Sequence, residues 1–253
     1  MPKQLAKYYN GNFYDARTDD ASRSARVVLE RLFEVYQPQS VVDFGCGQGS
    51  WLCTAEALGS HVLKGYDGPW VKEEHLLSEN IDFTATDLEH LEAADERFDL
   101  AISLEVAEHL SDGAASSFVD TLCRASDVVL FGAAIKLQGG THHVNEQWQS
   151  YWIDRFRDNK YECLDIFRGA LWNNPEVDWW YRQNTLLFVN STSSELKIDT
   201  NKLKSMEQMI ADAVHPENYE RKARPIRTAW HQVRQYVAGK NAVDRPIGGA
   251  NHT

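Results

Sequence analysis

The sequence predicts an α/β fold of the doubly wound kind, built on a mostly parallel, seven-stranded sheet. Short runs of β-branched and apolar residues recur along the chain, and stretches long enough for helices alternate with them. This alternation is typical of repeated βαβ units. A chain of 253 residues is also long enough to bury the core that such a sheet requires.

An amphipathic helix is predicted before the first strand. Apolar side chains recur every three or four positions between residues 21 and 36, which is the period of a helix with one buried face. Pro38 ends this helix. Residues 1–37 are therefore predicted to form a helical cap on the domain that follows.

Seven segments have the length and composition of strands. Helices are predicted between them at 50–58 and 114–125, and a further helix, with Trp148, Tyr151 and Trp152 on its apolar side, follows a polar loop at 136–146. The predicted strands are residues 41–44, 61–66, 81–84, 100–104, 128–131, 162–167 and 185–189.

The composition changes beyond residue 190, where Ser, Thr and charged residues replace the apolar runs. Helices are predicted near 202–214 and 224–237, and the last residues are expected to be disordered. This gives three regions: the cap at 1–37, an α/β domain at 38–190, and a helical extension at 191–253.

The bulk properties exclude several functional classes. A formal net charge of −11 would repel nucleic-acid phosphates, so no nucleic-acid substrate is expected. No run approaches the roughly 18 apolar residues of a membrane span, and no apolar leader opens the chain, so we expect a cytoplasmic protein. The four cysteines form no Cys-x-x-Cys pair, which argues against disulfides and a thiolate zinc site.

Basic residues are concentrated between positions 221 and 240, after an acidic body. They fit a solvated helix face that pairs with that body. The alternative is a docking surface for a protein partner, a second copy of the chain, or an anionic substrate.

A glycine turn follows the first predicted strand, with Gly45, Gly47 and Gly49 alternating with other residues. Glycines allow a sharp turn and let a ligand approach the backbone, while the N-terminus of the next helix adds partial positive charge. The Gly-x-Gly-x-Gly spacing differs from the Gly-x-Gly-x-x-Gly of dinucleotide-binding proteins.

An aspartate, Asp43, lies two residues before this turn. Its carboxylate would repel a pyrophosphate but would attract the ammonium group of a methionyl ligand. The charge pattern therefore favours S-adenosylmethionine over a dinucleotide.

Further acids end the next three strands: Asp67, Asp87 and Glu105. Ligands of doubly wound sheets bind at the carboxyl ends of the strands, so these acids are expected to converge on one crevice, where a carboxylate can hold both ribose hydroxyls. The alternative for each acid is a helix cap or a turn.

The segments 41–50 and 98–110, together with Asp67 and Asp87-Leu88, resemble the motifs of the class I S-adenosylmethionine-dependent methyltransferases of small-molecule type. The resemblance covers roughly residues 20–190 and implies a Rossmann-like methyltransferase fold at 38–190, with S-adenosylmethionine as cofactor. Residues beyond 190 lie outside it.

The resemblance also implies roles for individual residues. The turn from Gly45 to Gly49, with Cys46, would hold the methionyl group, and Asp67 would hold the ribose. Asp87 and the Leu88 backbone would read the adenine. Glu105 and Val106 would line the cofactor near the reaction centre, where His109 could orient the cofactor or an acid.

Two histidines, His142 and His143, lie in the polar loop after the fifth strand. Histidine can take a proton near neutral pH, and the loop resembles the lid of small-molecule methyltransferases, so His143 is the preferred base and His142 the second choice. The alternative is that one bonds a loop carbonyl and the other is exposed. A metal site made of these histidines and Glu146 is not predicted, because adjacent histidines point apart in most conformations.

The acceptor pocket is expected near Glu146, Tyr151 and an aromatic insertion that includes Trp179, Trp180 and Tyr181. Flat rings with polar edges suit a sugar or an aromatic ring. The alternative is that these rings fill the core.

Together these features predict O-methylation of a small hydroxylated acceptor, such as a sugar unit or secondary metabolite, by in-line transfer with a histidine base. The alternatives are an N-methyltransferase of a small amine, a binding module without catalysis, and a nicotinamide-dependent oxidoreductase.

Overall fold

The computed structural model describes residues 11–91, 96–194, 198 and 212–223. The chain divides into two compact units, Met1–Ala213 and Val214–Thr253. The described part of the second unit is short and is helical at 216–223.

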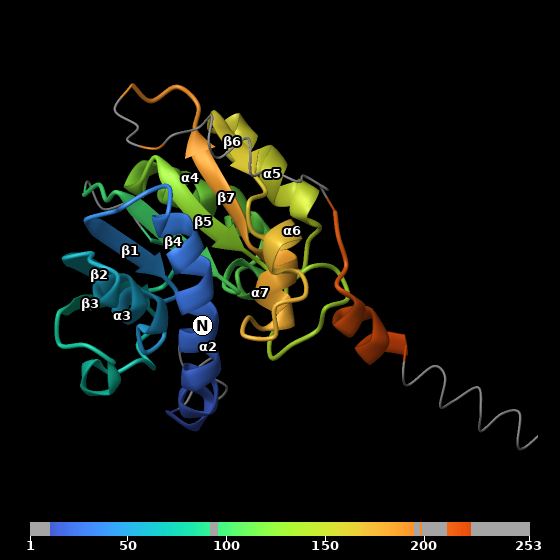
Figure 1. Ribbon diagram of the computed structural model, residues 1–253, viewed down its shortest axis with the longest axis horizontal. Coiled ribbons are helices and arrows are strands. Elements are labelled where there is room, and N and C mark those ends of the chain that lie inside the picture. Colours follow the sequence, from blue (N-terminus) through green and yellow to red (C-terminus); the bar gives the residue numbers. More distant parts are fainter. Residues whose placement is uncertain (1–10, 92–95, 195–197, 199–211, 224–253) are drawn as a thin grey trace, which may run out of the picture. The chain divides into compact units, whose positions relative to one another are not determined.

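The described part of the first unit contains one seven-stranded sheet with the order β3-β2-β1-β4-β5-β7-β6 (Figure 1). The first five strands pair in parallel, and β7 runs antiparallel to both β5 and β6. The predicted mostly parallel, seven-stranded sheet is thus confirmed. Its strands are β1 (Ser40–Phe44), β2 (Val62–Asp67), β3 (Ile81–Ala85), β4 (Leu100–Leu104), β5 (Val128–Gly132), β6 (Tyr161–Leu164) and β7 (Leu186–Asn190).

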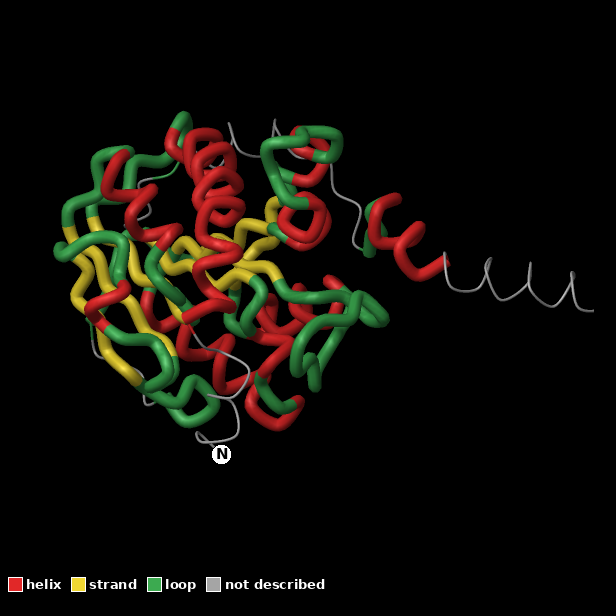
Figure 2. Tube along the Cα trace, turned by 90° about the horizontal axis from the view of Figure 1, so that it is seen from below, coloured by secondary structure: helices red, strands yellow, loops and turns green. Residues whose placement is uncertain are grey.

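Helices cover both sides of the sheet (Figure 2). The α-helices are α2 (Gly11–Phe33), α3 (Ser50–Ala57), α4 (Ala115–Ala125), α5 (Gln149–Asp158), α6 (Arg168–Leu171) and α7 (Trp179–Asn184). Short 3-10 turns are η1 (Glu73–His75), η2 (Ala107–His109) and η3 (Asp112–Ala114).

Two apolar layers hold the helices to the sheet. Successive strand residues point to opposite faces, so Val41 joins the layer under α2 and α3 while Val42 joins the layer under α4 and α5. Leu29 of α2 and Phe156 of α5 are fully buried, one in each layer. Burial on both faces explains why the central strands are almost entirely apolar.

Two predicted elements have ends that differ from the structure by more than one residue. Helix α2 extends over Gly11–Phe33, so it starts earlier and ends sooner than predicted. Strand β6 ends at Leu164, although the apolar run continues to Phe167, because Asp165 turns the chain: its carboxylate accepts hydrogen bonds from the backbone and the guanidinium of Arg168. Residues 165–167 are buried although they form a turn, so the apolar segment in the sequence is longer than the strand itself.

Most of the predicted C-terminal features lie outside the described residues. This applies to the helix at 224–237, to nearly all of the helix at 202–214, and to the basic segment apart from Arg221 and Lys222. The division into regions 1–37, 38–190 and 191–253 stays a prediction.

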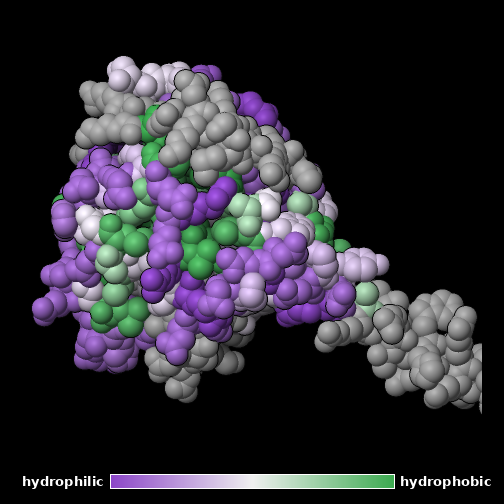
Figure 3. Space-filling view, viewed as in Figure 1, coloured by the Kyte–Doolittle hydropathy of each residue, from purple (hydrophilic) through white to green (hydrophobic). Residues whose placement is uncertain are grey.

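Within the described residues, no helix has both the length and the apolar character to cross a membrane. On the face shown in Figure 3, hydrophilic residues cover most of the described surface, and apolar residues lie in patches between them.

The strand order places β1 and β4 side by side at the centre of the sheet. The chain builds outward from β1 through β2 to β3, and from β4 to β5 in the opposite direction. The carboxyl ends of β1 and β4 therefore flank the switch point at which ligands of such sheets bind.

Candidate active site

The glycine turn after β1 has a backbone that only glycine adopts without strain. Gly45, Gly47 and Gly49 all have positive φ angles, at 91°, 53° and 87°. A Cβ on Gly45 would lie 2.3 Å from Cγ2 of Val106, and a Cβ on Gly49 would lie 2.5 Å from Cδ1 of Ile81. The turn is thus packed against the segment that follows β4, and both conformation and space require glycine.

Asp67, at the end of β2, is joined directly to this turn. Its carboxylate accepts hydrogen bonds from the Gly47 amide at 2.8 Å, the Gly68 amide at 2.6 Å and the Trp70 indole at 3.0 Å. Burial raises the pKa of Asp67 to about 6, and these hydrogen bonds offset part of the rise. The Asp67 carboxyl therefore changes its charge near pH 6.

Asp43 lies deeper, at 2% exposure, and its Oδ2 has no hydrogen-bond partner. Burial, and then the charge of Asp67, raise the pKa of Asp43 well above its ordinary value. Cys46 is buried beside them, and burial likewise raises its thiol pKa. A cationic group in this place would find two carboxyls and would favour their ionised forms.

Asp87 and Leu88 follow β3. The Asp87 carboxylate is exposed and bonds within its own turn, to the Glu89 amide at 3.1 Å and to Nδ1 of His90 at 3.1 Å. Leu88 lines a cleft of about 350 Å³ together with residues of α4 such as Phe118. Asp87 thus makes the contacts of a turn residue, which was the alternative role considered for each strand-end acid. Its expected contact with adenine stays a prediction.

Glu105 follows β4 in a strained backbone conformation. Its φ is 58°, which is uncommon for a residue with a Cβ and is often found at functional sites. Its carboxylate accepts hydrogen bonds from Asn184 Nδ2 at 2.7 Å and Gln138 Nε2 at 2.9 Å. The two amides hold the carboxylate in place.

Sequence reasoning missed these amide side chains. Gln138 and Asn184 are buried, and they also bond to each other at 3.1 Å. They lie 33 and 79 residues from Glu105, so no local spacing could have identified them. Trp70 was missed as well, although its position three residues after a strand-end acid was a usable indication.

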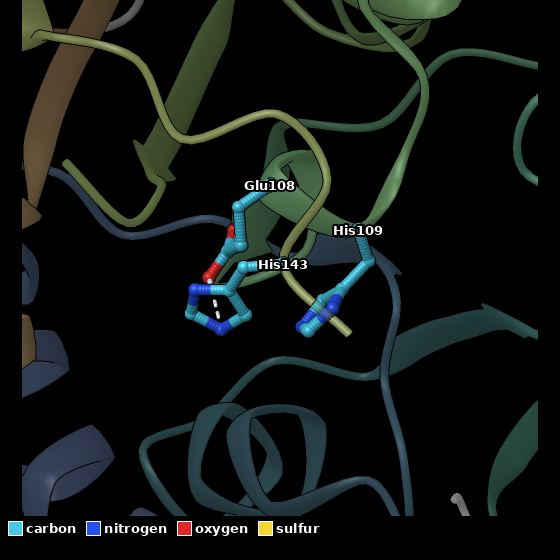
Figure 4. A group of neighbouring side chains, drawn as sticks. All are labelled: Glu108, His109 and His143. Carbon is cyan, nitrogen blue, oxygen red and sulfur yellow. Dashed lines mark ion pairs between the residues drawn. The ribbon is translucent and has the colours of Figure 1, made fainter. Parts of the chain in front are cut away.

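A second group of side chains forms beyond Glu105, where η2 meets the loop before α5. Glu108 and His109 come from η2 and His143 comes from the loop, and all three project to the same side (Figure 4). Glu108 Oε1 lies 4.0 Å from His143 Nε2, and the rings of His109 and His143 meet edge to face with centroids 4.9 Å apart. The amides of Val144 and Asn145 donate to the Glu108 carbonyl and fasten the loop to η2.

His143 is held by Glu146 on its other side. Nδ1 of His143 lies 2.8 Å from Oε1 of Glu146, and the same carboxylate oxygen accepts from the Gly139 amide. A Cβ on Gly140 would lie 2.1 Å from Nε2 of His143, so the ring packs directly against this glycine. His142 has an exposed side chain and a φ of 58°, and its carbonyl lies 3.2 Å from His109 Nδ1.

The predicted aromatic residues occupy different places. Tyr181 of α7 is partly buried and stacks edge to face on Trp51 of α3, with centroids 5.3 Å apart. The pKa of Tyr181 is raised by burial and then by the charge of Glu105, so its hydroxyl lies near that acid. Trp179 is buried and Trp180 packs against it.

Tyr151 has a clear structural role. Its hydroxyl donates to Asp112 of η3, and the guanidinium of Arg155 lies 3.3 Å from its ring centroid. The hydrogen bond ties α5 to η3, the ring contact lies within α5, and a role for Tyr151 in the acceptor pocket stays a prediction.

The structure thus gathers the predicted residues into two groups. The first comprises the glycine turn with Cys46, Asp43, Asp67 and Val106. The second comprises His109, His143 and Glu146, and the structure adds Glu108, which was not predicted as a site residue. Glu105 lies between the groups, because the next residue, Val106, packs against Gly45 while Glu105 acts on the charge of Glu108. Asp87 and Tyr151 bond elsewhere.

Comparison with known proteins agrees with this architecture. The sequence model of a family described as methyltransferase domain matches residues 17–182. The chain is 36% identical over 91 residues to a ubiquinone biosynthesis O-methyltransferase of Methylobacterium sp. (strain 4-46), a match that covers 34% of this chain and 36% of the relative. It is 29% identical over 139 residues to a malonyl-[acyl-carrier protein] O-methyltransferase of Pseudescherichia vulneris, covering 54% of each.

The chain therefore spans about a third to a half of the length of these curated relatives. Among solved structures, magnesium protoporphyrin IX methyltransferase of Synechocystis PCC 6803 with bound SAH superimposes with a TM-score of 0.55 at 19% identity. That match covers 76% of this chain and 100% of the other, and it shows a shared fold.

Proposed function

The chain belongs to the class I S-adenosylmethionine-dependent methyltransferases, and from this premise we propose that it methylates an oxygen of a small hydroxylated acceptor. Both curated relatives are named as O-methyltransferases. The observation that carries the proposal is the fixed imidazole of His143, because a group that assists deprotonation favours transfer to an oxygen acceptor, and an amine acceptor has less need of it.

The first group of residues fits the cofactor of this family. The glycine turn follows β1 at the switch point of the sheet, where ligands of this kind of fold bind, and Asp43 offers a buried carboxylate oxygen without a hydrogen-bond partner, which suits an ammonium group. Asp67 would hold the ribose hydroxyls beside the bonds it already accepts from the turn. The cofactor supplies a methyl group on a sulfonium, which is an excellent leaving group.

The chain's own residues would align the acceptor and remove its proton. A carboxylate can only accept a hydrogen bond, so the contact between His143 Nδ1 and Glu146 places a proton on Nδ1. The lone pair of His143 is then on Nε2, on the side of the ring that faces Glu108. We assign His143 as the base that takes the hydroxyl proton and Glu146 as the residue that positions it.

The acceptor pocket is proposed between the loop at 136–146 and α7. Tyr181 lies beside both Trp51 and Glu105, which provides a flat apolar wall close to the strand-end acids. Such a wall suits a sugar unit or an aromatic secondary metabolite. Trp180, packed beside Tyr181 with ring centroids 5.9 Å apart, would extend it.

The test compares the wild type with His143→Ala on panels of alcohols, phenols and amines, with formation of S-adenosylhomocysteine as the readout. Loss of a positioned base should lower kcat about 10²–10⁴-fold for hydroxyl acceptors and leave S-adenosylhomocysteine affinity unchanged. His61→Ala, which removes an exposed histidine next to the start of β2, is the matched control and should keep wild-type activity.

Other outcomes would overturn the proposal. Methylation of amines alone, with equal rates in the wild type and His143→Ala, would make the chain an N-methyltransferase. Cofactor binding without turnover on any acceptor, together with a protein partner, would make it a binding module.

A further inference from the structure

The cluster of Glu108, His109 and His143 has an electrostatic property that a base alone does not explain. Glu108 is fully buried, and its carboxylate oxygens make no well-formed hydrogen bond, although the nearby backbone amides of Glu108 and Ala134 favour its ionised form. Burial, and then the charge of Glu105, raise the pKa of Glu108 well above its ordinary value. A carboxyl in these surroundings is either protonated or balanced by a positive charge, and a coordinated cation would supply that charge.

The histidines of the cluster are held in the manner of metal ligands. His143 Nδ1 faces the Glu146 carboxylate at 2.8 Å, and His109 Nδ1 faces the His142 carbonyl at 3.2 Å. Both oxygens can only accept, so each ring has its proton on Nδ1 and its lone pair on Nε2. A carboxylate or carbonyl that fixes the second nitrogen is the usual surrounding of a histidine bound to a metal.

The distances are close to those around one ion. One ligand atom from each of the three residues lies within 4.8 Å of the other two. The 4.0 Å between Glu108 Oε1 and His143 Nε2 is too long for a hydrogen bond, and ligand atoms bonded to one cation at about 2.0–2.2 Å lie about 3.3–3.6 Å apart at tetrahedral angles. Binding of a cation would therefore draw the three side chains inward.

We propose that Glu108, His109 and His143 bind one divalent transition-metal cation. Two imidazole nitrogens and one carboxylate suit Mn²⁺, Fe²⁺, Co²⁺ or Zn²⁺ better than Ca²⁺ or Mg²⁺, which prefer oxygen ligands alone. Three protein ligands leave coordination positions open for the acceptor's oxygens.

This inference rests on the proposed function and changes one of its steps. While Nε2 of His143 is bonded to a cation it cannot accept a proton, so His143 acts as a ligand. The cation lowers the pKa of the acceptor hydroxyl bound to it, and the hydroxyl proton passes to solvent water. Methyl transfer then depends on the metal.

A second cluster shows what a site of this kind needs. Asp87, Glu89 and His90 also place ligand atoms close together, but Asp87 and His90 are exposed. The Asp87 carboxylate already bonds to His90 and to the Glu89 amide, and Glu89 accepts from the Ser111 amide. This cluster therefore serves as the internal comparison.

The experiment titrates the full chain, freed of metal with a chelator, with Mn²⁺, and follows free Mn²⁺ by electron paramagnetic resonance. We expect one saturable site in the wild type. Glu108→Gln keeps the size of the side chain and removes its charge, so affinity should fall at least about tenfold. Glu146→Gln, which alters the partner of His143, should cost about 10–100-fold.

His90→Ala is the matched control and should bind Mn²⁺ as the wild type does. S-adenosylhomocysteine binding to each variant reports that the fold is intact, and His143→Ala provides a second ligand variant if Glu108→Gln does not fold. A wild type without a saturable site for Mn²⁺ or Zn²⁺, or equal affinities in Glu108→Gln and His90→Ala, would overturn the inference.

Turnover separates this inference from the function on which it rests. Glu108-dependent Mn²⁺ binding without methylation of any hydroxyl would support the metal site and contradict the proposed function. Full methylation of a hydroxyl acceptor in the presence of chelator would support the function and overturn the metal site.

Discussion

At the scale of single residues, Asp67 links the charge of the site to pH. Its pKa is raised to about 6 because burial outweighs the hydrogen bonds from Gly47, Gly68 and Trp70. In the free protein the neutral form of Asp67 is therefore favoured below about pH 6, and the stability that this form contributes is lost as the pH rises through about 6. A ligand that donates hydroxyl protons to Asp67 favours the ionised form.

Cofactor affinity should consequently weaken as the pH falls below 6. If only the ionised form binds, the Kd of S-adenosylhomocysteine rises by up to about tenfold per pH unit below that value. Titration calorimetry between pH 5 and 8 measures this slope. Asp67→Asn is neutral at every pH, so it should bind S-adenosylhomocysteine as weakly at pH 8 as the wild type does at its low-pH limit. Tight binding by Asp67→Asn that still weakens below pH 6 would assign the titration to another group.

Gly45 tests the turn itself. Alanine at this position combines a φ of 91° with a Cβ only 2.3 Å from Val106, whereas Gly59 has a φ of 107° and no atom within 4 Å of an added Cβ. Each alanine should cost about 1–2 kcal/mol of stability from the backbone strain. Only Gly45→Ala should also lose S-adenosylhomocysteine binding, as measured by calorimetry beside urea unfolding. Equal binding by the two variants would contradict the role of the turn.

At the residue scale, local patterns were sufficient to select part of the candidate site. The glycines and Asp67 could be identified because their chemistry lies within a few positions of a strand end. The pairing of Glu105 with Gln138 and Asn184, and of His143 with Glu108, could not, since these partners meet only through the sheet order. Asp87 shows that a local pattern can also select a residue whose contacts are local. It ends a strand as predicted for a ligand-binding acid, but its carboxylate bonds within its own turn.

At the scale of elements, the long first helix positions the aromatic insertion. Ser24 of α2 accepts a hydrogen bond from the Asp178 amide at 3.0 Å and donates to the Asp178 carboxylate at 3.5 Å. Asp178 is the residue before α7, which carries Tyr181. Helix α2 therefore fixes the start of the helix whose tyrosine lies beside Glu105.

Ser24→Ala should loosen this connection. It leaves the Asp178 amide without its buried partner, which costs about 1–3 kcal/mol, and it should weaken the near-ultraviolet dichroism of the Trp51 and Tyr181 pair. Ser22→Ala, on the same helix but less buried, is the control and should change neither quantity. A Ser24→Ala variant as stable as this control would show that α2 does not position α7.

The positions of the strands were the easiest feature to predict from the sequence, and the directions of the strands were the hardest. All five parallel strands lie within one residue of their predicted ends, because buried strands form continuous apolar runs between turns. The same apolar run gives no direction, so the antiparallel course of β7 became known only from its pairing with β5 and β6. Helices α6 and α7 are short and lie in a segment whose aromatic residues mask any period.

At the scale of the whole molecule, the sheet order explains why both groups of residues lie at the same edge of the sheet. The glycine turn follows β1 and Glu105 follows β4, and these strands are neighbours at the switch point. The family match at residues 17–182 begins within α2 and ends in α7. The binding of cofactor and acceptor is therefore expected to depend on the body of the sheet.

The most direct test of the central claim is calorimetric binding of S-adenosylhomocysteine and of NADH to the wild type and to Asp67→Ala, with Gly59→Ala as the control for altered stability. The account predicts one S-adenosylhomocysteine site in the wild type and in Gly59→Ala, no NADH site, and loss of the site in Asp67→Ala. Unchanged S-adenosylhomocysteine binding by Asp67→Ala, or tighter binding of NADH by the wild type, would contradict it.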